Sequence, residues 1–202
     1  MPVSLPPLDK QILRLHELGI PELAGLSAND LDLPDVDNAL LVVHPDRLKT
    51  SALAPLLRHK EKPGFVVLDM PDLDDFTPTV ELPNKPVYLV TDIDRGDDMA
   101  NWTPEDALPE ITGAGRTPLT VGEGVQWLLH QPEALERTRC FMTISSRLRK
   151  ADGKFDTRTP AIWISNGIGR DGRGHKDAPK VGWCWWGNRH TWLGFASGRT
   201  RS

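Results

Sequence analysis

Cysteine is scarce in this chain, and long apolar runs are absent. The 202 residues include two cysteines, Cys140 and Cys184, and no Cys-x-x-Cys pair. A disulfide-stapled miniprotein, a zinc ribbon and a thioredoxin-type redox motif are therefore excluded, and two free thiols are expected. The longest unbroken apolar run, residues 39–43, has five residues, whereas a membrane-spanning helix needs about 20.

A secretory signal is also missing from the beginning of the sequence. Neither a basic start nor an apolar block precedes Asp9, so we expect a cytoplasmic protein that does not enter a membrane. The sequence shows no obvious DNA-binding motif either. The sequence therefore identifies no binding partner.

What is present is typical of a globular protein. Apolar residues make up 39% and charged residues 26% of the chain, close to the values of ordinary soluble domains. The 17 glycines and 18 prolines predict many turns and short elements. A chain of 202 residues fits one domain or two small ones, and we predict a single compact domain over residues 1–202.

The charges divide the chain into two subregions of opposite sign. Residues 1–136 hold 10 Lys and Arg against 24 Asp and Glu, a net charge of −14, while residues 137–202 hold 14 against 4, a net charge of +10. We expect the acidic and the basic subregion to attract each other within one body. The alternative is that the basic section binds nucleic acid, and such binding weakens steeply as salt is added.

Apolar periodicity predicts an α/β layer in the acidic subregion. A helical pattern covers residues 8–18, and two further helices are expected after the hydroxyl caps Thr103 and Thr120. Continuous apolar runs predict three buried strands, at residues 40–43, 65–68 and 87–90. The basic subregion predicts four more, at residues 141–144, 161–164, 181–186 and 191–196. The expected fold is thus mixed α/β (α+β), with a Trp-rich antiparallel section packed on the α/β layer.

Tryptophan is concentrated in the basic subregion, where five of the seven indoles lie between residues 163 and 192. Gly187-Asn188 predicts a two-residue hairpin turn between the last two strands. Because side chains alternate along a strand, one face of this hairpin is expected to carry Trp183, Trp185, His190 and Trp192. The other face is expected to carry Cys184, Trp186, Arg189 and Thr191.

An aromatic face with a histidine favours a binding site. Indole rings stack on bases, sugars or cations, and Arg173 and Lys180, which precede the hairpin in the sequence, are placed to reach an anion. The first hypothesis is therefore a small-ligand or partner-binding protein that uses this face. The alternative, that the indoles pack on the helices as core, stays open.

A second hypothesis comes from Asp92-Ile93-Asp94, which directly follows an apolar strand. A strand followed by Asp-x-Asp resembles the first motif of haloacid-dehalogenase-type phosphohydrolases, and this resemblance implies Mg²⁺, with Asp92 as nucleophile and Asp94 as acid/base. Arg95-Gly96 departs from the motif. A turn that caps backbone amides is the alternative. If the strands are parallel, Asp46 and Asp69 would join these two residues in an acidic crevice.

Several segments of the chain resemble a family of uncharacterised bacterial proteins of about this length, found mainly in high-GC actinobacterial-type lineages. The segments are residues 40–45, 62–70, 94–97, 101–102, 117–120, 179–185 and 190–194. The resemblance covers most of the chain and implies a free-standing cytoplasmic protein. It implies no chemistry, so no catalytic residue is carried over.

Overall fold

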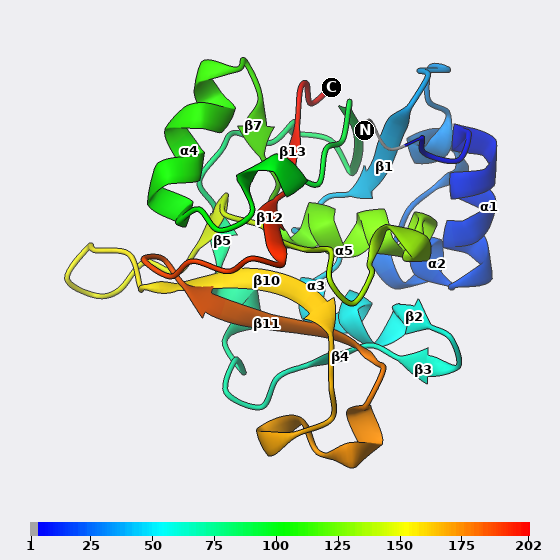
Figure 1. Ribbon diagram of the computed structural model, residues 1–202. Coiled ribbons are helices and arrows are strands. Elements are labelled where there is room, and N and C mark those ends of the chain that lie inside the picture. Colours follow the sequence, from blue (N-terminus) through cyan, green and yellow to red (C-terminus); the bar gives the residue numbers. More distant parts are fainter. Residues whose placement is uncertain (1–3) are drawn as a thin grey trace.

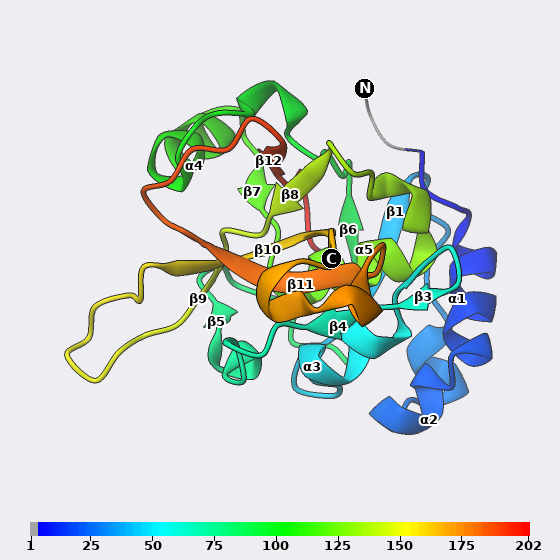
Figure 2. The ribbon, with the colours of Figure 1, turned by 60° about the horizontal axis from the view of Figure 1, so that its bottom comes forward.

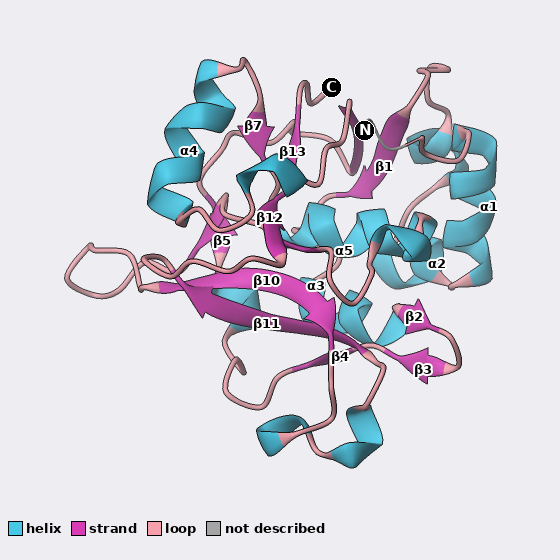
Figure 3. Cartoon of the chain, viewed as in Figure 1, coloured by secondary structure: helices cyan, strands magenta, loops and turns pink. Residues whose placement is uncertain are grey.

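The computed structural model describes residues 4–202 and shows a mixed α/β fold, which confirms the expected class (Figure 1). Its five α-helices are α1 (Leu8–Glu17), α2 (Ile20–Ala24), α3 (Thr50–Leu53), α4 (Pro104–Gly113) and α5 (Val121–His130). Figure 3 shows these helices around strands that are mostly short. Within residues 4–202, no helix has the length and apolar character needed to cross a membrane.

A five-stranded sheet of order β12-β8-β10-β11-β4 is the largest sheet of the described chain. Its strands are β4 (Phe65–Val66), β8 (Cys140–Met142), β10 (Arg158–Ile164), β11 (Pro179–Trp185) and β12 (Leu193–Phe195). β10 pairs antiparallel with β8 and β11, while β4 and β12 join the two edges in parallel. Since β4 comes from the acidic subregion and its neighbour β11 from the basic one, the two subregions share this sheet.

The remaining strands form four two-stranded sheets within the described residues, and each sheet pairs its strands antiparallel. They are β1 (Ala39–Val43) with β6 (Val87–Thr91), β2 (Arg58–His59) with β3 (Lys62–Pro63), β5 (Thr77–Pro78) with β9 (Ser146–Arg147), and β7 (Thr117–Pro118) with β13 (Ser197–Gly198). The last two pairs again join the acidic subregion to the basic one.

Helix α5 lies between the β1–β6 pair and the five-stranded sheet (Figure 1). It begins with the predicted capping box, in which Thr120 Oγ1 accepts from the Glu123 amide at 3.2 Å and Glu123 accepts from the Thr120 amide at 2.8 Å. Gly124 faces the sheet, where an added Cβ would stand 3.0 Å from Phe141 Cε2. The absence of a side chain there lets the helix pack closely on β8 and β10.

Strand β1 has its free edge covered by two amide side chains. Gln11 of α1 accepts from the Leu41 amide at 2.8 Å and donates to the Ala39 carbonyl at 2.7 Å. Gln126 of α5 does the same for the amide and carbonyl of Val43, at 2.7 and 2.9 Å. These bonds satisfy backbone groups that would otherwise be buried without partners.

The prediction of an acidic crevice is wrong. β1 and β6 run antiparallel, and β4 belongs to the other sheet. The carboxyl ends of these strands therefore do not meet at one edge, and Asp46, Asp69 and Asp92 lie apart. Apolar runs reveal that strands are buried but not the direction in which they pair.

The predicted tryptophan hairpin is also wrong. β11 pairs with β10, whereas β12 pairs with β8, so β11 and β12 are separated by two strands. Residues 186–192 instead cross the sheet from one strand to the other (Figure 1). The Trp186 amide donates to the Thr157 carbonyl at 2.7 Å, so the chain continues to follow the β10 side after β11 ends.

The two oppositely charged subregions meet through direct ion pairs. Five of the ion pairs link an acidic residue before position 137 to an arginine after it: Asp69–Arg170, Asp72–Arg158, Asp92–Arg199, Asp106–Arg189 and Glu123–Arg201. The end of the chain also runs beside β6, where the amides of Leu89 and Thr91 donate to the carbonyls of Ser202 and Thr200 at 3.0 and 3.1 Å. Much of the basic charge is therefore neutralised within the protein.

Candidate functional site

Trp163 is the central side chain of the candidate site. The register of β10 and β11 pairs it with Lys180, and alternation places both on the same sheet face as Gly182. The indole covers Gly182, where an added Cβ would stand 2.7 Å from Trp163 Cη2. Lys180 Nζ lies 4.6 Å from the indole centroid and pairs with Asp171 at 2.8 Å.

Trp192 joins Trp163 from the segment that crosses the sheet. The two indole centroids are 6.1 Å apart at an interplanar angle of 67°, an edge-to-face arrangement that is favourable for aromatic pairs. The crossing segment is held in place by its neighbours: the Asn101 amide donates to the His190 carbonyl at 2.8 Å, and Arg189 pairs with Asp106 at 2.8 Å. The position of Trp192 is thus fixed from both the sheet and helix α4.

His190 packs behind Trp192, with its ring centroid 5.3 Å from the indole. Its Nε2 atom is buried without a hydrogen-bond partner among the described residues. Burial lowers the pKa of His190, since a buried imidazole loses the hydration that stabilises its charged form. A neutral imidazole therefore supports the Trp192 ring.

The two indoles border a cleft of about 630 Å³, which we name the Trp163–Trp192 cleft. Its lining residues come from three segments of the chain: Arg137, Thr138, Trp163, Ile164, Asn166, Thr191 and Trp192. The indoles and Ile164 provide apolar surface, while the other side chains provide hydrogen-bonding groups. An apolar surface with a few polar groups is the common composition of a small-molecule site, and the volume lies in the usual range.

Arg137 stands at the polar edge of the cleft. Its guanidinium pairs with the carboxylate of Asp177, and this bond holds the pKa of that carboxyl below its usual range. About half of the Arg137 side chain is exposed. It therefore has free N–H groups with which to contact a ligand.

A second hollow of about 450 Å³ adjoins the cleft, because Thr138, Thr191 and Trp192 line both. Its polar wall contains Arg95, which donates to both carboxylate oxygens of Asp97 at 2.7 Å. Arg95 also donates to the Ala134 carbonyl at 2.7 Å. These bonds fix the guanidinium, so the depression extends beyond the indoles as a polar groove.

The structure divides the predicted aromatic face into two separate groups. Trp192 and His190 lie with Trp163, while Trp183 and Trp185 form an edge-to-face pair of their own at 4.5 Å. Alternation along β11 places Trp183 and Trp185 on the opposite sheet face from Lys180. Neither of them lines the Trp163–Trp192 cleft.

The basic residues predicted beside the aromatic face also separate. Lys180 lies against Trp163 but is already paired with Asp171. Arg173 is exposed on the 3₁₀ turn η7 (Arg173–His175), outside the cleft lining. Trp163 was not among the predicted site residues, although its place in a predicted strand was a signal that it could share a face with a basic neighbour.

Asp92 and Asp94 do not fit a magnesium-dependent site. Asp92 Oδ2 accepts from Arg116 at 2.7 Å and from Arg199 at 3.1 Å. The hydrogen bond from Arg199, together with Arg116, lowers the pKa of Asp92 against the opposing effect of burial. Asp94 Oδ1 accepts from the Gly96 amide at 2.7 Å. The first carboxylate is thus neutralised by two guanidinium groups and the second caps a turn.

The arrangement of the other metal-binding side chains agrees with this geometry. Among residues 4–202, no cluster of three or more His, Cys, Asp or Glu side chains is arranged to hold a metal ion. We therefore assign no chemistry to the acidic loop.

Comparison with known proteins gives one match. A family model described as "Family of unknown function (DUF5701)" matches residues 14–202. No curated protein and no solved structure matches the chain. The match agrees with the resemblance noted from the sequence and adds no activity.

Proposed function

Because the chain belongs to the family of unknown function DUF5701, its activity has to be inferred from the site itself, and we propose that it binds a small molecule in the Trp163–Trp192 cleft. The ligand is a planar ring that carries an anionic group. The ring packs on the indoles of Trp163 and Trp192, and the anionic group accepts from Arg137. The observation that carries the proposal is the pairing of two indoles in a cleft of about 630 Å³ beside a half-exposed arginine.

The surroundings of the cleft support a ring rather than a flexible apolar chain. Two indoles at 67° offer one ring face and one ring edge, and both interact well with an aromatic ligand. Thr138, Asn166 and Thr191 add donors and acceptors around them. Rigid aromatic surface with a few convergent polar groups gives orientation as well as affinity.

Quenching of tryptophan fluorescence by three probes tests the proposal. Adenosine monophosphate and benzoate carry a ring and an anion, and cellobiose is an uncharged sugar of similar size. We expect saturable quenching by at least one of the two anions, with a Kd below about 1 mM, equivalent to about −4 kcal/mol, and none by cellobiose. Replacing Arg137 with Gln should weaken binding of the anion about tenfold, a loss of about 1.4 kcal/mol.

Two tryptophan variants identify the binding position. Trp192→Leu should abolish the quenching, whereas Trp185→Leu, a control on the opposite sheet face, should leave the affinity unchanged. Equal effects of both variants, or saturable binding of cellobiose alone, would show that the assigned cleft or ligand class is wrong. Circular dichroism spectra that match the parent show that each variant has folded.

A further inference from the structure

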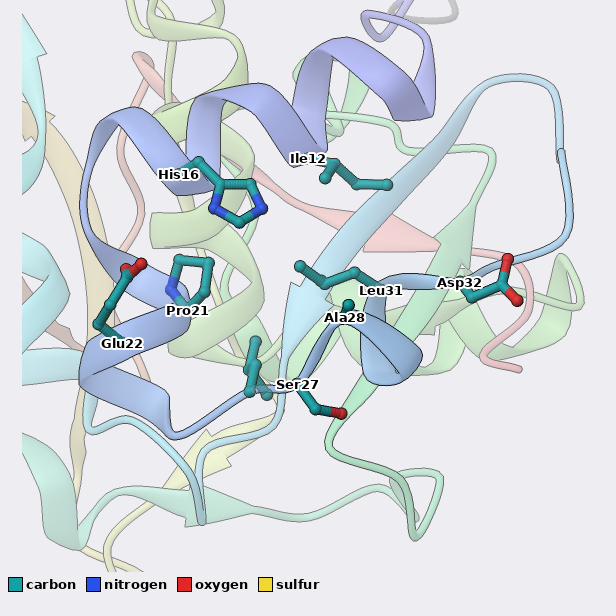
Figure 4. Close-up of a pocket in the computed structure, with 9 residues that line it drawn as sticks. Ile12, His16, Pro21, Glu22, Ser27, Ala28, Leu31 and Asp32 are labelled. Atoms are coloured by element: carbon teal, nitrogen blue, oxygen red, sulfur yellow. The ribbon is translucent and has the colours of Figure 1, made fainter.

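A second groove lies among the helices at the start of the chain, formed by elements other than those of the Trp163–Trp192 cleft. Helices α1 and α2 and the 3₁₀ turn η1 (Ala28–Leu31) surround a hollow of about 480 Å³. Its floor is apolar and is made by Ile12, Pro21, Leu26 and Leu31. Figure 4 shows Glu22 and Asp32 on opposite sides of this hollow.

Two glycines and the short lengths of α2 and η1 leave this groove uncovered. Gly19 and Gly25 adopt positive φ angles of 66° and 62°, at the two ends of α2. The chain therefore reverses direction after α1 and again after α2. A capping box between Ser27 and Asp30 then fixes η1, with the Ser27 amide and hydroxyl both 2.7 Å from the Asp30 carboxylate. Helices of five and four residues are too short to cover the floor between them.

The groove lies in a long acidic stretch of the chain that has no basic Lys or Arg. Residues 15–46 contain no Lys or Arg and seven acidic residues: Glu17, Glu22, Asp30, Asp32, Asp35, Asp37 and Asp46. Glu17 pairs with Arg14 at 2.9 Å, and Asp30 serves the capping box. Glu22 and Asp32, at the groove itself, have no Lys or Arg within ion-pair distance in the described part of the chain. The groove therefore has an apolar floor and an unneutralised acidic rim.

We propose that this groove docks a basic amphipathic helix of a partner protein. Apolar side chains spaced three and four residues apart on such a helix enter the hollow and pack on Ile12, Leu26 and Leu31. Lysine or arginine side chains on either side of that stripe pair with Glu22 and Asp32. Complementary charge sets the orientation of the helix and speeds its association.

Fluorescence anisotropy with a designed peptide tests this proposal. The probe is a labelled peptide of about 15 residues, long enough to form a helix on binding, with leucines on one face and lysines on the other. We expect saturable binding at low salt, with a Kd of about 10 μM, that weakens as salt is added. A second peptide with every leucine replaced by serine keeps the charge and should bind at least tenfold more weakly.

Variants of the full-length protein locate the binding site. Ala28→Arg places a cation at an exposed position of the groove, and the double variant Glu22→Lys/Asp32→Lys reverses the charge of its rim. Each is expected to weaken binding tenfold or more. The matched control Glu61→Lys/Glu81→Lys makes the same change in net charge at exposed positions elsewhere and should alter the Kd less than twofold.

Three results would overturn the proposal. The first is an equal loss of affinity in the rim variant and the control, which would mean non-specific attraction. The second is the absence of saturable binding. The third is sedimentation that shows a dimer of the parent protein which Ala28→Arg converts to monomers, because the groove would then hold a second copy of this chain.

Discussion

The ion pair between Arg201 and Glu123 allows the most specific prediction on stability. Both side chains are almost completely buried, with exposed fractions of 7% and 0%. The guanidinium makes two parallel bonds to the carboxylate, at 2.7 and 2.8 Å, and donates further to Thr117 and the Pro118 carbonyl. Although burial opposes it, the carboxylate of Glu123 raises the pKa of Arg201.

Replacing Arg201 with Met leaves a buried carboxylate without its cation. Tyr88 and the Thr120 amide still donate to Glu123, at 3.0 and 2.8 Å, but neither carries a positive charge. Breaking a buried pair from one side costs about 3–5 kcal/mol, against a free energy of unfolding of about 5–15 kcal/mol for a whole domain. We therefore expect Arg201→Met to remove a large part of the stability of the protein.

Urea denaturation followed by circular dichroism measures this cost, and Arg199→Met is its control. Arg199 also pairs with an acid of the first subregion, but its side chain is 54% exposed, and exposed pairs contribute about 0–1 kcal/mol. The double variant Arg201→Met/Glu123→Gln should recover much of the lost stability, since it removes the unpaired charge. A loss below about 1 kcal/mol in Arg201→Met, equal to an exposed pair, would refute the reasoning.

Three other predictions concern buried groups and cooperativity. Burial lowers the pKa of His130 to about 4. The stability that depends on the neutral imidazole is therefore complete above the unfolded pKa near 6.5, and it falls as the pH drops toward 4, by about 2 kcal/mol at pH 5. Urea denaturation at pH 7 and 5 should show a smaller loss in His130→Leu than in the parent, and identical losses would contradict this. Burial also raises the pKa of Cys140 to about 11 and that of Cys184 to about 12. A thiol reagent at pH 8 should therefore modify both cysteines only after denaturation. Rapid modification of the folded protein would show instead that the thiols are accessible. Finally, we propose that residues 1–136 and 137–202 unfold as one unit, because they share a sheet and five ion pairs; limited proteolysis that releases two stable fragments near position 136 would disprove it.

Local signals in the sequence identified the longer helices and strands. The capping residues Thr103 and Thr120 each precede the helix that they predict, at Pro104 and Val121. The apolar run 39–43 forms β1 as a fully buried strand. These features depend on neighbours within a few residues, so the sequence reports them directly.

Pairing between distant segments could not be predicted in the same way. Gly187-Asn188 is a suitable hairpin turn, but the strand that precedes it pairs with β10 and the strand that follows it pairs with β8. In addition, β4 has only two half-buried residues, and Leu68, at the end of the apolar run 65–68, is 84% exposed. Which strands become neighbours depends on the packing of the whole chain, and one favourable turn sequence does not decide it.

The residues of the candidate site could likewise be predicted only in part from the sequence. Trp192 and His190 were predicted as site residues and lie beside the cleft. Trp163 was not predicted, and only the register of β10 with β11 identifies it as a residue of the site. Figure 2 views β11 from a second side, with the 3₁₀ turns of residues 169–175 in front of it. The sequence thus identified the aromatic residue type, and tertiary structure determined which indoles form a pair.

The proposal that small molecules bind in the Trp163–Trp192 cleft can be tested directly by NMR spectroscopy of the seven tryptophans. Each indole N–H gives one signal in a ¹⁵N-labelled sample, and single Trp→Phe variants assign the signals of Trp163, Trp192, Trp183 and Trp185. During titration with adenosine monophosphate or benzoate, we expect the Trp163 and Trp192 signals to shift together with one Kd, while those of Trp183 and Trp185 stay in place. Shifts confined to Trp183 and Trp185, or no shift with either probe, would contradict the proposal.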